Sequence, residues 1–99
     1  MIWVHCGDKS EVFSTLSLAT RLHEHSDTMD VLVTAGADIL PLLTQVPNGV
    51  HVVPIPQDSI VKVQAFLEEW APQYLIWNGG SARPVLLRCV EKNGLGATM

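Results

Sequence analysis

The feature that most constrains the fold is a regular alternation of short apolar runs with segments of helical periodicity. Apolar, β-branched runs predict strands at 2–6, 31–34, 50–55, 74–77 and 95–99. Segments with apolar residues at three-to-four spacing predict helices at 12 to about 23–25, 38–43, 59–70 and 82–92. This order predicts an α/β fold with a parallel sheet covered on both faces. Right-handed crossovers make it a Rossmann-like, doubly wound, three-layer sandwich with strand order 3-2-1-4-5.

Capping residues are expected to begin most of these helices. Asp8 and Glu11 have the spacing of a capping box before the first helix. We expect Asp38 to cap the second, and Asp58 or Ser59 the third. The turn after the first helix is predicted at Ser26–Asp27. The apolar face of the first helix comprises Val12, Leu16, Ala19 and Leu22, joined by Phe13.

The composition is that of one small globular domain, predicted to span residues 1–99. The hydrophobic fraction is 47% and the charged fraction only 16%. Such low charge is a mild indication that a partner domain is missing. The short last strand favours a chain cut from a longer protein. The net charge of −4, without a cluster of Lys or Arg, argues against a nucleic-acid partner.

Cysteine usage and hydropathy indicate the compartment. Cys6 and Cys89 are far apart and are expected to be reduced, buried thiols. No apolar run reaches the roughly 18 residues of a transmembrane helix. We find no targeting segment within these residues, and we expect a cytoplasmic protein.

The loop after the first strand is the first place to look for chemistry, because such folds place ligands at the carboxyl edge of the sheet. Glu11 lies there and has two interpretations. It can complete the Asp8 cap, which spacing alone favours, or act as a general base toward a hydroxyl nucleophile. His5 is either a satisfied, partly buried histidine or a group that orients Glu11 or a ligand.

The other motifs are weaker. The fourth βα loop, Asn78–Ser81, either presents amide groups to an anion or only forms a sharp turn. G-x-G-x-x-G and P-loop patterns are absent, so we expect no cofactor. His23 and His25 are two residues apart on a helix and do not form a metal pair, so no metal site is predicted.

Several segments, in order along the whole chain, resemble one family. They are Ile2–His5 with Ser10–Val12 (V-W-V-H-A-x-S-x-G-E-V), Leu32–Thr34 (L-V-T), Pro54–Asp58 (P-x-D) and Phe66–Pro72 (F-L-x-x-W-x-P). The chain thus resembles the amino-terminal domain of bacterial 3-deoxy-D-manno-octulosonic-acid (Kdo) transferases.

The resemblance implies a GT-B glycosyltransferase, with two Rossmann-like domains facing across a cleft. The amino-terminal domain faces the lipid A precursor, a glycolipid acceptor. The carboxyl-terminal domain, absent here, binds CMP-Kdo. The reaction belongs to lipopolysaccharide biosynthesis, and peripheral contact with the inner membrane is expected. The family also tends to carry a membrane anchor before the first strand, which these residues lack.

The resemblance also assigns site residues. Glu11 takes the place of the general base, while Asp8 and Ser10 replace the serine and glycine of S-x-G-E. His5 and the loop residues Gly79, Gly80 and Ser81 are expected to line the acceptor pocket. If Pro84 is aligned with the proline of E-T-E-L-W-P, both glutamates are missing. This implies a divergent member with another acceptor, or one that has lost activity. The isolated domain is expected to be inactive because the nucleotide-binding half is missing. The alternative is a non-catalytic module that binds an anion or a sugar phosphate.

Overall fold

The computed structural model describes residues 1–25, 29–44, 46–81 and 83–98. Its sheet has five parallel strands in the order β3-β2-β1-β4-β5, as predicted. The strands are β1 (Ile2–Cys6), β2 (Val31–Ala35), β3 (Val50–Pro54), β4 (Tyr74–Asn78) and β5 (Gly96–Thr98). The helices are η1 (Lys9–Glu11), α1 (Val12–His25), η2 (Leu40–Leu42), α2 (Ile60–Trp70) and α3 (Pro84–Lys92).

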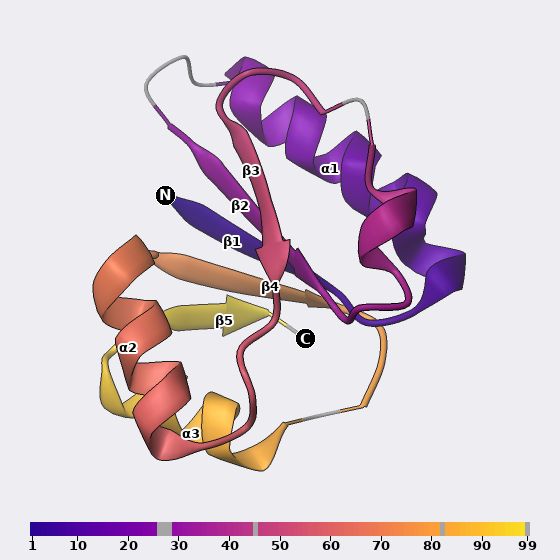
Figure 1. The fold of residues 1–99 in the computed structure, drawn as a ribbon. Coiled ribbons are helices and arrows are strands. Elements are labelled where there is room, and N and C mark those ends of the chain that lie inside the picture. Colours follow the sequence, from indigo (N-terminus) through magenta and orange to yellow (C-terminus); the bar gives the residue numbers. More distant parts are fainter. Residues whose placement is uncertain (26–28, 45, 82, 99) are drawn as a thin grey trace.

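The sheet is the middle of three layers (Figure 1). Helix α1 covers one face, and α2 and α3 cover the other. The central strands β1 and β2 are therefore buried on both faces, which explains their continuous apolar sequences. Along β1, Trp3 packs toward α2 and α3, whereas Val4 packs toward α1. The predicted fold class is confirmed.

Several local predictions are wrong. Asp8 makes no side-chain cap, and a short 3₁₀ turn, η1, precedes α1. Glu11 instead accepts a hydrogen bond from Ser14 Oγ at 3.0 Å, so there is no capping box. The helix expected after Asp38 is only the 3₁₀ turn η2, with Ile39 as its N-cap. Phe13 is 85% exposed, since it lies on the outer side of α1.

Other local predictions need adjustment. Ser59 caps α2 by accepting a hydrogen bond from the Lys62 amide, as one of the two alternatives stated. Helix α3 begins at Pro84. The turn predicted at Ser26–Asp27, and the first residue expected for the last helix, Ala82, lie outside the described residues. Both cysteines are free and buried, as expected.

Candidate functional site

The switch point of the sheet lies between β1 and β4, where the chain changes direction across the strand order. A cavity of about 410 Å³ opens near the carboxyl ends of the strands at this edge. The lining comes from the ends or following loops of β1, β2 and β4: His5, Cys6, Gly7, Gly36, Asp38, Ile39, Ser81 and Arg83. Three segments distant in sequence thus meet where α/β folds bind ligands.

His5 forms part of this lining and is only 4% exposed. Its Nδ1 lies 2.9 Å from Thr34 Oγ1, on the neighbouring strand of the sheet. The same hydroxyl accepts a hydrogen bond from Trp3 Nε1 at 2.8 Å. The other neighbouring strand places Trp77 against the His5 ring, with centroids 4.1 Å apart. The imidazole is therefore held on both sides.

Burial, the larger cause, and the positive charge of Arg83 together lower the pKa of His5 from 6.5 to about 4. A hydrogen bond to the backbone of Thr34 opposes the shift. His5 is consequently a neutral imidazole at neutral pH. The cavity then carries one positive group, Arg83, and one negative group, Asp38.

Glu11 lies beside this cavity and does not form part of its lining. Its Cγ is 2.9 Å from the position that a Cβ on Gly79 would take. On the other side of the loop, a Cβ on Gly7 would lie 1.8 Å from the Gly79 carbonyl oxygen. The backbone of Gly7, which lines the cavity, thus packs on the same glycine that Glu11 approaches. The two loops are therefore in direct contact.

Asn78, named above only as the first residue of the fourth loop, and Ser14, which no motif indicated, hold this corner together. Asn78 Nδ2 donates to Ser14 Oγ at 3.1 Å and to Thr15 Oγ1 at 2.8 Å. Ser14 Oγ in turn lies within hydrogen-bonding distance of the Glu11 carboxylate. The end of β4 is therefore linked through the first turn of α1 to Glu11. A polar residue closing a buried strand, such as Asn78, was the available signal.

The predicted site residues fall into two neighbouring groups. His5 and Ser81 line the cavity. Glu11 and Asp8 lie against Gly79, with Asp8 Oδ2 at 3.6 Å from its hypothetical Cβ. Gly80 packs on Gly7, and Ser10 is exposed on η1. Arg83, Asp38 and Thr34 were not predicted as site residues, although each follows or ends a strand at this edge.

An anion site was one of two interpretations of the fourth loop, and the first amides of the helix after it are already occupied. Asp58 Oδ1 accepts a hydrogen bond from the Leu86 amide at 2.8 Å, and Oδ2 accepts one from Val85 at 3.4 Å. These amides belong to the first turn of α3, so Asp58 supplies the negative charge that an anion would bring. An anion therefore cannot use these two amides, and Arg83 is a side chain at this edge that can bind one.

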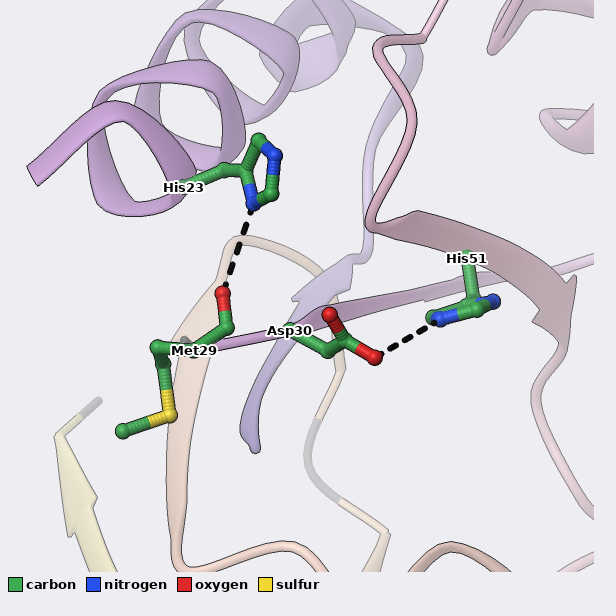
Figure 2. A network of polar contacts seen from close by, with 4 residues as sticks. All are labelled: His23, Met29, Asp30 and His51. Carbon is green, nitrogen blue, oxygen red and sulfur yellow. Dashed lines mark hydrogen bonds and ion pairs between the residues drawn. The ribbon is translucent and has the colours of Figure 1, made fainter. Parts of the chain in front are cut away.

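His23 and His51 lie near the starts of β2 and β3, at the opposite, amino-terminal edge of the sheet (Figure 2). His23 Nδ1 is 3.4 Å from the Met29 carbonyl oxygen, and His51 Nε2 is 3.3 Å from Asp30 Oδ2. Within the four described ranges, no group of three His, Cys, Asp or Glu residues could hold a metal ion. No described helix has the length and apolarity needed to cross a membrane.

The architecture and the cavity define a class: a Rossmann-like α/β domain with a polar site at its switch point. The family model described as 3-deoxy-D-manno-octulosonic-acid transferase (kdotransferase) matches residues 1–99. The chain therefore belongs to the Kdo transferase family, as its amino-terminal domain, and the expected resemblance is confirmed. No curated protein sequence matches the chain significantly.

Proposed function

We propose that this chain is the acceptor-side domain of a GT-B glycosyltransferase that transfers Kdo from CMP-Kdo to a lipid A precursor. Membership of the Kdo transferase family carries this proposal. The donor would be bound by a second, carboxyl-terminal domain. The acceptor would lie at the carboxyl edge of β1, β2 and β4, in the cytoplasm at the inner face of the membrane.

In this proposal Glu11 is the general base. Its carboxylate is partly exposed at the switch point, where it can accept the proton of an acceptor hydroxyl as that oxygen attacks the anomeric carbon. Ser14 donates a hydrogen bond to this carboxylate, and Asn78 donates one to Ser14, so the two residues restrict the position of the carboxylate. Such positioning matters because proton transfer requires hydrogen-bonding distance to the reacting hydroxyl. His5, Ser81 and Arg83 would bind a neighbouring part of the acceptor.

The test joins the chain to a carboxyl-terminal domain of the family and measures Kdo transfer from CMP-Kdo. We expect Glu11→Gln to lower kcat at least about 100-fold, the usual contribution of a general base. Glu24→Gln, at an exposed position near the other end of α1, is the matched control and should retain activity. Full activity in the Glu11 variant would exclude the assigned role.

A non-catalytic binding module is the second candidate. The cavity beside Arg83 favours it, because it joins a guanidinium, a serine hydroxyl and a neutral histidine without including Glu11. Binding of an anionic sugar with no transfer activity, even when the second domain is restored, would support this candidate over the first.

A further inference from the structure

The hydrogen bonds among Trp3, Thr34 and His5 favour one of the two neutral tautomers of His5. The indole nitrogen of Trp3 can only donate, so it uses a lone pair of the Thr34 hydroxyl. The hydroxyl keeps its proton and a second lone pair. Donation of that proton to His5 Nδ1, 2.9 Å away, is the arrangement in which the hydroxyl both accepts and donates within this group. A neutral ring that accepts at Nδ1 carries its proton on Nε2. Nε2 is then a donor belonging to a side chain that lines the cavity.

The other polar side chains of the cavity match a ligand with an anionic end and a hydroxyl-bearing end. Arg83 provides a guanidinium, whose planar donors suit phosphate and carboxylate oxygens. Ser81 adds a hydroxyl. Asp38 is exposed, and its Oδ1 lies 3.1 Å from the Cβ position of Gly36. A carboxylate on this side repels a second anion but accepts hydrogen bonds from sugar hydroxyls.

We propose that His5, held by the Trp3–Thr34 hydrogen bonds, presents a fixed Nε2–H that binds an oxyanion of an acidic sugar together with Arg83 and Ser81. Thr34 is a positioning residue, because it acts through His5. The inference rests on the proposed function in one respect only: that function identifies the acceptor as the molecule that carries the acidic sugar. Tautomer and binding are both measured on the present chain without a transfer assay, so failure here leaves the role of Glu11 untouched.

The first experiment determines the tautomer of His5 from long-range ¹H–¹⁵N correlation spectra at neutral pH. We expect a protonated Nε2 and an unprotonated Nδ1. Thr34→Val should change this tautomer, because the hydroxyl is removed. Thr34→Ser should retain it, because the hydroxyl is kept. A proton on Nδ1 in the wild-type protein would overturn the proposal, and this result does not depend on whether the valine variant folds.

The second experiment titrates the chain with glucose 6-phosphate, glucuronate and glucose. Either acidic sugar should bind at least about tenfold more tightly than glucose, with amide shifts at 5–7 and at Ser81 and Arg83. Arg83→Gln should remove this preference, while Arg88→Gln, on the exposed side of α3, should keep it. The phosphate and carboxylate arms identify the preferred oxyanion. Equal binding of glucose, or an unchanged preference in Arg83→Gln, would overturn the proposal.

Discussion

At the scale of single residues, side chains near the ends of three neighbouring strands contact one another. Register places His5 between Thr34 and Trp77, its partners on the two neighbouring strands. The sequence contains all three at strand ends, so their proximity followed from the predicted topology. The hydrogen bond from Trp3 to Thr34 did not, because it depends on the rotamers of two buried side chains.

Protonation of His5 should make stability depend on pH. The unfolded chain takes up this proton near pH 6.5, whereas the folded protein resists it until about pH 4. The contribution of neutral His5 to the free energy of unfolding is therefore fully present above pH 6.5 and is lost as the pH falls toward 4. The shift corresponds to about 3 kcal/mol at its full extent. Urea unfolding at a series of pH values measures it.

Two variants separate this effect from the titration of carboxylates. His5→Gln should lose stability at neutral pH but show a shallower decline between pH 6.5 and 4. His25→Gln, which changes an exposed histidine, should keep the wild-type slope. If both variants decline in parallel with the wild type, His5 is not the group responsible.

At the scale of elements, the start of α3 depends on a residue from a distant loop. Asp58 precedes α2 yet accepts hydrogen bonds from two amides of α3, while its neighbour Ser59 caps α2. Sequence spacing identified both as possible caps of one helix. It could not assign Asp58 to a helix 26 residues later, because only the tertiary arrangement brings them together.

Removing this cap should loosen α3 selectively. Asp58→Ala should cost about 1 to 2 kcal/mol of unfolding free energy and speed exchange of the Leu86 amide. Ser59→Ala should cost about 1 kcal/mol and affect the first turn of α2. Gln57→Ala, at the adjacent exposed position, is the neutral control. Equal exchange rates at Leu86 in all three variants would contradict the assignment.

Contact between the first and fourth loops should make Gly7 intolerant of substitution. A Cβ there would lie 1.8 Å from Gly79 O and 2.7 Å from Gly80 Cα, and backbone atoms on both sides cannot rotate away. We expect Gly7→Ala to cost at least about 2 kcal/mol.

Gly36→Ala is the matched control for Gly7, since its Cβ would approach only the Asp38 side chain, at 3.1 Å. That carboxylate can move, so the variant should stay within about 1 kcal/mol of the wild type. Chemical denaturation measures both changes. Comparable losses at the two positions would show that close approach of the loops is not the cause.

At the scale of the whole molecule, periodicity was sufficient for the fold but not for the site. Continuous apolar strands at 2–6 and 31–34 predicted a sheet buried on both faces. The right-handedness of crossovers between parallel strands then predicted the strand order. The separation of Glu11 from the His5 cavity was not predictable. It arises from the path of the loops around Gly7 and Gly79, which no spacing rule fixes.

The same arrangement predicts a gradient of local stability across the sheet. Strands β1 and β2 are almost completely buried, whereas every residue of β5 is exposed. Tyr74 reaches across to Thr98, but this contact lies at the surface. Opening β5 therefore exposes little apolar area, while opening β1 disrupts both cores.

Native-state hydrogen exchange should consequently show the slowest amides in β1 and β2 and the fastest strand amides in β5. Edge strand β3 is the internal comparison, because it pairs on only one side yet keeps Val50 buried. Its protection should lie between those of β1 and β5. Protection in β5 equal to that in β1 would mean that the outer edge opens only when the whole sheet unfolds, and that burial does not set the gradient.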